Sequence, residues 1–199
     1  MNNQFLTAIK TRRTYYEISK ETVITDEELQ QLIQEAVKHT PSAFNSQSAR
    51  VVLLLGRHHD KLWNLTKEAL KKIVPAANFA ATEEKITSFQ NGYASLLFLE
   101  DMTVVENLQK RFPVYQDNFP LWSLQSSGMV QHVIWTALET AGFGASLQHY
   151  NPIIDESVKA EWHLPPEWKL LAQMPFGKPA AQPSPKDFLP IAERLRIFK

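Results

Sequence analysis

The sequence predicts a single α+β or α/β domain, because amphipathic helices alternate along it with short, continuous apolar segments. Helical segments are marked by apolar residues that recur every three or four positions, as in residues 29–37. Apolar segments such as 51–55 have the length and composition of buried strands. A chain of 199 residues without repeats or linkers is most simply one domain. We therefore expect residues 1–199 to fold as one unit.

Two helices have clear boundaries. Thr25 and Glu28 form a capping-box pattern before the apolar stripe of 29–37, and Pro41 ends that helix. A longer helix is expected over 121–141, ended by the glycines of Gly142-Phe143-Gly144. Its apolar positions predict one buried stripe, formed by Met129, Val130, Val133, Ile134, Ala137, Leu138 and Ala141. Shorter helices are expected over 5–12, 61–73, 104–112 and 155–163.

Three segments are expected to be strands. The runs 51–55 and 93–99 predict strands covered on both faces, and 169–174 predicts a third. Prolines then punctuate the chain and predict an extended tail, at positions 175, 179, 183, 185 and 190. Alternation in 194–198 predicts a final strand. This tail suits either an arm that crosses onto a partner subunit or a segment that lies on its own domain.

Composition excludes several function classes. The 21 basic and 21 acidic residues give zero formal net charge, which argues against a nucleic-acid partner held by a large positive field. Cysteine is absent, so disulfides, thiolate catalysis and cysteine-based metal sites are excluded. The adjacent His58-His59 pair lacks metal-ligand spacing, and we expect no metal site. No apolar run has the length of a membrane span or a signal peptide, which leads us to expect a cytoplasmic protein without a membrane partner.

Arg12-Arg13-Thr14 is the first candidate binding motif. Two forked guanidiniums and a hydroxyl are suited to holding a phosphate. The competing interpretation is structural, because cations are favoured near the C-terminus of a helix. Known phosphate loops offer no alternative site, since neither the dinucleotide-binding nor the P-loop glycine pattern occurs.

The loop 40–47 is the second candidate, because Ser42, Asn45 and Gln47 can present several donors and acceptors to a flat polar ligand. Ordinary turn formation explains the same residues. Further along, Gln148 and His149 follow the long helix, although a single histidine more often has a structural role. Phe44, Phe119 and Trp122 are the aromatic residues considered for a flat pocket; most others are expected in the core.

Taken in order along the chain, these segments resemble the nitroreductase superfamily of FMN enzymes. That family typically carries R-R-[ST] near its N-terminus, a P-S-x-x-N-x-Q loop and a later glycine-ended helix. The chain resembles more narrowly the short branch of fungal fatty-acid-repression and HBN-type proteins, which has bacterial members. This narrower likeness rests on three segments: 89–93, 147–152 and 174–179. The resemblance as a whole covers essentially the entire chain.

The resemblance implies a homodimer of α+β sandwiches, each with a mostly antiparallel sheet flanked by helices and a C-terminal arm reaching the partner. FMN would lie at the interface. The arginines and hydroxyl of Arg12-Arg13-Thr14 would hold its phosphate and pyrimidine edge. Lys186, or its rival Lys178, would grip the phosphate. The isoalloxazine ring would be lined from the partner chain by Ser42, Ala43, Asn45 and Gln47, and near flavin N5 by the backbone of Leu147, Gln148 and His149.

Two positions depart from the family pattern, because Tyr16 and Phe188 stand where many relatives have basic residues. The resemblance implies an NAD(P)H oxidoreductase that reduces nitroaromatics or quinones by a ping-pong hydride transfer. The flavin would carry this chemistry, so no catalytic side chain is required; Gln148 and His149 are the candidates nearest N5. The alternatives are a non-catalytic flavin dimer that senses redox state or regulates, and a structural helical dimer without flavin.

Overall fold

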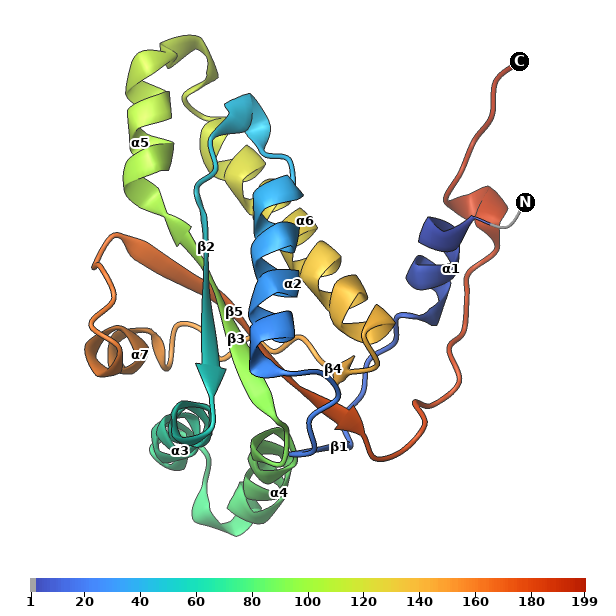
Figure 1. The fold of residues 1–199 in the computed structure, drawn as a ribbon. Helices are drawn as coiled ribbons and strands as arrows, with labels where there is room; N and C mark the ends of the chain where they lie inside the picture. The colour runs from blue at the N-terminus through green and yellow to red at the C-terminus, as the bar shows by residue number, and fades with distance from the viewer. Residues whose placement is uncertain (1–2) are drawn as a thin grey trace.

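The computed structural model describes residues 3–199 and confirms the α+β prediction. Its core is a five-stranded sheet in the order β1-β5-β3-β2, with β4 also paired to β5, and every pairing is antiparallel (Figure 1). The strands are β1 (Ile18–Ser19), β2 (Ala49–Leu55), β3 (Ala94–Asp101), β4 (Gly144–Ala145) and β5 (Trp168–Pro179).

Helices cover both faces of this sheet (Figure 1). On one face, α2 (Asp26–His39) and α6 (Phe119–Thr140) bury a cluster that includes Leu29, Ile134 and Phe176. On the other face lie α3 (Arg57–Lys71), α4 (Phe79–Gln90) and α7 (Asp155–Glu161), around Trp63 and Phe89. The remaining helices are α1 (Gln4–Thr11), α5 (Met102–Arg111) and four short turns of 3₁₀ helix: 43–45, 76–78, 113–115 and 191–193. No helix within residues 3–199 has the length and apolar character needed to cross a bilayer.

The predicted caps are confirmed. Thr25 accepts from the Glu28 backbone N–H, and the Glu28 carboxylate accepts from the Thr25 backbone N–H, so α2 begins at the predicted residue. Gly142 follows α6 with a φ of +97°, a conformation that favours glycine. Gly144 is different from the prediction: it opens β4 and lies against Tyr15, where an added Cβ would come within 2.8 Å of the Tyr15 Cβ.

The burial of β2 and of the α6 stripe is lower than predicted, and one helix was not predicted. β2 is covered on both faces as predicted, because Val51, Leu53 and Leu55 pack against one core cluster and Val52 and Leu54 against the other. As an edge strand, however, it has only Leu54 fully buried. The α6 stripe is divided: Val130, Ile134 and Leu138 are buried, whereas Met129 and Val133 point outward. In addition, α4 was not predicted, since Ile86 and Phe89 are its only buried residues.

The proline-rich tail also differs from the prediction. β5 continues through Pro175, whose carbonyl accepts from the Ser146 N–H at 3.2 Å. The predicted strand over 194–198 is absent, because nothing in the described chain pairs with that segment. Instead, the tail after β5 runs beside α1, away from the sheet (Figure 1). Its apolar side chains Phe188, Ile191 and Phe198 are exposed, as is Phe5 of α1.

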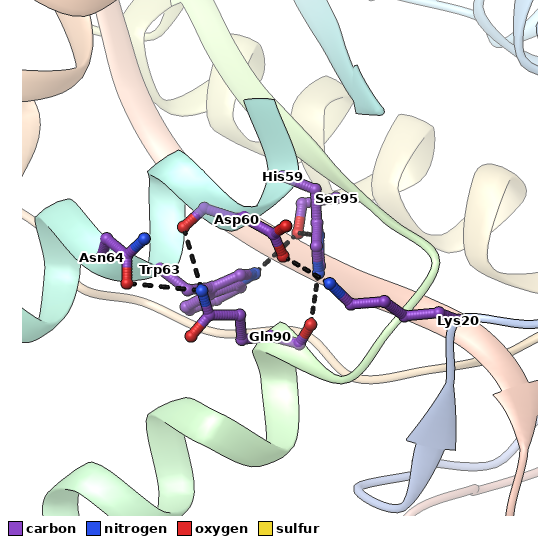
Figure 2. A network of polar contacts seen from close by, with 7 residues as sticks. All are labelled: Lys20, His59, Asp60, Trp63, Asn64, Gln90 and Ser95. Atoms are coloured by element: carbon purple, nitrogen blue, oxygen red, sulfur yellow. Dashed lines mark hydrogen bonds and ion pairs between the residues drawn. The ribbon is translucent and has the colours of Figure 1, made fainter. Parts of the chain in front are cut away.

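A buried polar network ties α3 and α4 to β3 on the sheet face opposite α6 (Figure 2). The Trp63 indole N–H donates to Ser95 Oγ at 2.9 Å, and Ser95 Oγ is 2.9 Å from His59 Nδ1. The other ring nitrogen of His59 lies 3.2 Å from the Gln90 carbonyl, which can only accept. His59 Nε2 therefore carries the proton, and Nδ1 accepts from Ser95. At the rim of the network, Lys20 pairs with Asp60 at 2.7 Å.

Candidate functional site

The motif Arg12-Arg13-Thr14 is held beside the segment that follows α6. Thr14 forms a parallel bridge with Ala145, and the Tyr15 N–H donates to the Ala145 carbonyl at 2.9 Å. Ala145 in turn pairs with Phe176 of β5. The arginine motif is thereby held at one edge of the sheet, against β4, which ends two residues before the predicted segment 147–149.

A cavity of about 510 Å³ opens between this motif and the C-terminal tail. The cavity is lined by three basic side chains, Arg12, Arg13 and Lys186, and by two carboxylates, Glu17 and Asp187. The formal charge of its lining is therefore +1. The Arg13 guanidinium donates to the Ser184 carbonyl, which fixes the tail across the cavity. A walled space with excess positive charge and a hydroxyl is chemically suited to a phosphate. The full lining is 12–17 and 181–187.

Arg12 is positioned by α6. Its guanidinium carbon lies 4.3 Å from the centre of the Trp135 ring, and burial lowers its pKa although Glu139 opposes this. Arg12 Nη1 is buried and has no hydrogen-bond partner within residues 3–199. Glu139 accepts from the Tyr15 hydroxyl at 3.2 Å, and its pKa is raised, mainly by burial. A buried guanidinium nitrogen without a partner marks Arg12 as a donor available to a ligand.

The structure separates the two lysines proposed for the phosphate. Lys186 lines the cavity with Arg12 and Arg13, with its ammonium 5.2 Å from the Phe188 ring. Lys178 does not line it and pairs with Glu21 at 2.5 Å. Lys186 is therefore the better placed of the two. Tyr16, which stands where many relatives have a basic residue, also lines this cavity.

The loop 42–47 has an unusual backbone. Phe44, Asn45 and Gln47 have φ values of +56°, +50° and +50°, in the left-handed region that side chains other than glycine rarely adopt. Ser42 Oγ accepts from the Gln47 N–H at 2.9 Å, and Ser126 Oγ accepts from the Ala43 N–H at 3.4 Å. Strain of this kind persists where the surrounding structure imposes it, and it is commonly associated with functional loops. The Asn45 and Gln47 side chains are exposed.

Aromatic packing holds this loop at the far end of α6. The Phe44 ring lies 5.1 Å from Phe112, 5.3 Å from Phe119 and 6.0 Å from Trp122, measured between ring centroids. A second cavity, of about 420 Å³, lies beside Phe44, Trp122 and Met129. The loop contacts the first turns of α6, whereas Arg12 contacts its last turns. Within one chain, Ser42, Ala43, Asn45 and Gln47 are thus not brought to the cavity of Arg12.

The segment 147–151 runs along β5. Gln148 and Gln173 exchange two backbone hydrogen bonds, of 2.7 and 2.9 Å. The Gln148 carboxamide donates to Ser146 Oγ at 3.1 Å, so its side chain is turned inward, whereas His149 is exposed and Leu147 is half-buried. The backbone of this segment is consequently fixed, and His149 is the side chain it presents to solvent.

Sequence reasoning missed three residues that shape the site. Tyr15 and Glu139 form the contact that joins the arginine motif to α6. Gln173 binds the 148–151 segment from inside the sheet. Glu139 gave no signal in the sequence, because it is one acidic residue near the end of a helix. Gln173 was visible as a glutamine inside the otherwise apolar run 170–176.

Comparisons with known proteins agree with this arrangement. The family model described as "Nitroreductase family" matches residues 9–178. The yeast protein HBN1 (Saccharomyces cerevisiae) is 35% identical over 187 residues, which are 93% of each chain. The structure of nitroreductase CinD from Lactococcus lactis in complex with chloramphenicol superposes with a TM-score of 0.91 at 41% identity, covering 98% of this chain and 100% of that one. A more distant Desulfovibrio desulfuricans structure in complex with FMN shares the fold, with a TM-score of 0.71 at 19% identity, covering 100% of this chain and 99% of the other.

Proposed function

The chain belongs to the nitroreductase family, and from this premise we propose that it is an FMN-dependent NAD(P)H oxidoreductase that reduces nitroaromatic compounds or quinones. The observation that carries the proposal is the meeting of Arg12, Arg13, Thr14 and Lys186 around one cavity. The relative in complex with chloramphenicol, at 41% identity, supports a nitroaromatic acceptor.

The residues present fit FMN. Its phosphate needs charged donors, and Arg12 offers a buried Nη1 that no group within residues 3–199 engages. The Thr14 hydroxyl and the Lys186 ammonium are further donors on the same cavity. We assign Arg12, Arg13, Thr14 and Lys186 to the phosphate and the pyrimidine edge, and the exposed carboxamides of Asn45 and Gln47, with Ser42 and Ala43, to the ring.

When bound, FMN would supply the hydride chemistry for a ping-pong reaction between NAD(P)H and the second substrate. The protein's role is binding, orientation and local electrostatics. Backbone groups of Leu147, Gln148 and His149 would be held at the flavin edge by their pairing with β5. No side chain of these three needs to be an acid or base, although Gln148 and His149 are the ones nearest the reacting edge.

We propose that the enzyme works as a homodimer in which the 42–47 loop of one subunit faces the arginine motif of the other. Loop and motif lie at opposite ends of α6, so a site that uses both requires two chains. The outer face of α6 supplies an apolar surface, where a cavity of about 460 Å³ is lined by residues such as Phe5, Leu32 and Val133. The exposed apolar tail provides a second surface of the same kind for the partner.

The acceptor would bind beside the aromatic cluster of the 42–47 loop. Phe44 and Trp122 are stacked, with an interplanar angle of 18°, and they border the 420 Å³ cavity. Flat aromatic acceptors are favoured by such surfaces, which discriminate poorly among them. Broad specificity for nitroaromatics and quinones is expected.

A visible absorption spectrum of purified protein, loaded with FMN and then treated anaerobically with NADH or NADPH, tests the proposal. We expect a flavin band that the nicotinamide bleaches and that a nitroaromatic or quinone restores. A band that neither nicotinamide changes would instead favour a redox-sensing flavin dimer. Colourless protein that takes up no FMN would overturn both.

A further inference from the structure

Gln173 is fully buried in the central strand β5, and all four of its hydrogen-bonding groups point to one segment. Its backbone N–H and C=O exchange bonds with Gln148. Its carboxamide oxygen accepts from the Tyr150 N–H at 2.8 Å, and its carboxamide nitrogen donates to Asn151 Oδ1 at 3.2 Å. A single side chain thus continues, for two more residues, the pairing that the strand backbone begins.

Asn151 extends the same arrangement. Its side-chain nitrogen donates to the Leu170 carbonyl at 2.9 Å and to Asp155 Oδ1 at 2.8 Å. Both polar atoms of the Asn151 carboxamide are therefore used, one of them by Gln173. Because the buried Gln173 amide and the half-buried Asn151 amide have all their polar atoms paired, the segment 148–151 has little freedom relative to β5.

We propose that Gln173 is a positioning residue for the flavin: its carboxamide fixes the backbone of 148–151 against the ring edge without touching the cofactor. The inference rests on the proposed function, in which the backbone of Leu147, Gln148 and His149 approaches that edge. Loss of the carboxamide would leave the Tyr150 N–H and the Asn151 oxygen unpaired and would allow the segment to move. The affinity for FMN and the midpoint potential of bound FMN should respond, because both depend on the groups placed at the ring.

The variant Gln173→Met tests the positioning role. Methionine has a similar length, but its thioether is only a weak hydrogen-bond acceptor and donates no hydrogen bond. We expect FMN affinity to fall about tenfold, which corresponds to part of the net contribution of the two hydrogen bonds that the carboxamide makes, together with a shift in the midpoint potential. Ser95→Ala is the matched control. Ser95 is also fully buried, lies on the same face of the sheet and belongs to the separate network of Figure 2. It should lower thermal stability and leave the flavin unchanged.

Gln173→Glu gives a second, independent readout. A protonated carboxyl accepts and donates like the carboxamide, whereas a carboxylate only accepts. The differences in flavin affinity and midpoint potential between this variant and the parent should therefore be small at acidic pH and grow at alkaline pH, with both proteins measured at each pH. This variant also serves if Gln173→Met fails to fold.

The outcomes are distinguishable. Parent protein that binds no FMN would refute the proposed function and this inference with it. Parent protein that binds FMN, with variants of unchanged affinity and potential, would refute the positioning role of Gln173 alone. Equal changes in Ser95→Ala would show that general destabilisation is the cause, which would also refute it.

Discussion

The Arg12 guanidinium lies over the Trp135 indole, with 4.3 Å between its central carbon and the ring centroid. This contact joins α1 to the last turns of α6 and holds a cation whose Nη1 is buried without a partner among residues 3–199. A cation over an aromatic face keeps its in-plane N–H groups available. The stacking therefore orients Arg12 for a ligand in the adjacent cavity.

Arg12→Ala should weaken FMN binding about 30-fold, equivalent to roughly 2 kcal/mol for a charge-assisted hydrogen bond. Fluorescence titration with FMN measures this directly. Lys178→Ala is the control, because Lys178 lies outside the cavity and pairs with Glu21. Equal affinities for the Arg12 variant and the parent would remove Arg12 from the phosphate site.

Asn45 can be replaced in two ways that separate its backbone role from its side-chain role. Asn45→Gly and Asn45→Ala both remove the carboxamide and should weaken FMN binding to the same degree. Only alanine is unfavourable at a φ of +50°, so it should be less stable than glycine by roughly 1 kcal/mol. Urea unfolding measures the difference, and identical stability of the two variants would argue against strain in this loop.

His59 should make the protein sensitive to mild acid. Burial lowers the pKa of His59, a shift that the Gln90 carbonyl and Asp60 partly oppose. The folded-state pKa is therefore below the unfolded value of about 6.5, so the unfolded chain takes up the proton first. The stabilisation is fully present above that value and is lost as the pH falls through the folded pKa, with a slope of at most about 1.4 kcal/mol per pH unit.

Urea unfolding between pH 7.5 and 5 checks this, with His59→Gln as the comparison. Other groups titrate in both proteins, so the difference between the two curves reports His59. A pH-independent difference would show that the pKa of His59 is the same in the folded and unfolded states, which would contradict the prediction.

Glu100 should change the free energy of unfolding with pH in the opposite direction to His59. Its carboxyl group is fully buried, and neither oxygen has a hydrogen-bond partner within residues 3–199. Burial raises its pKa, although the neighbouring Ser48 hydroxyl and Arg50 oppose the shift. An acid with a raised folded pKa contributes stability below its unfolded pKa that is lost as the pH rises through the folded value.

Glu100→Gln removes the ionisation, and its advantage over the parent should grow with pH to about 1 kcal/mol or more at pH 8. Thermal unfolding at pH 5, 6.5 and 8 measures this trend. An advantage that stays constant with pH would indicate that Glu100 is not perturbed by burial.

Local signals predicted much of the fold. Thr25 and Glu28 located the start of α2, since a capping box depends only on residues close in sequence. The run 93–99 identified β3, which is buried on both faces. The same reasoning overestimated the burial of 51–55, because an apolar run does not reveal whether a strand lies at the edge of the sheet.

Features that depend on contacts between residues far apart in the sequence could not be predicted from local patterns. Alternation in 194–198 suggested a strand, but a strand needs a neighbour, and none is present in residues 3–199. Pro175 lies in β5 because its carbonyl, not its missing N–H, takes part in pairing. For the site, the motif Arg12-Arg13-Thr14 was found by resemblance, whereas its packing on Trp135 required the tertiary structure.

The hydrogen bond from Arg13 to Ser184 joins residues that are 171 positions apart in the sequence. It can therefore form only late in the synthesis of the chain. The arginine motif is synthesised first, and the tail residue that it binds follows 171 residues later. At ordinary translation rates of roughly 5–20 residues per second, the interval is about 10 to 30 s. Over that time the nascent chain lacks one wall of the cavity between the arginine motif and the tail, so a ligand that needs both walls is expected to bind only after the tail has been made.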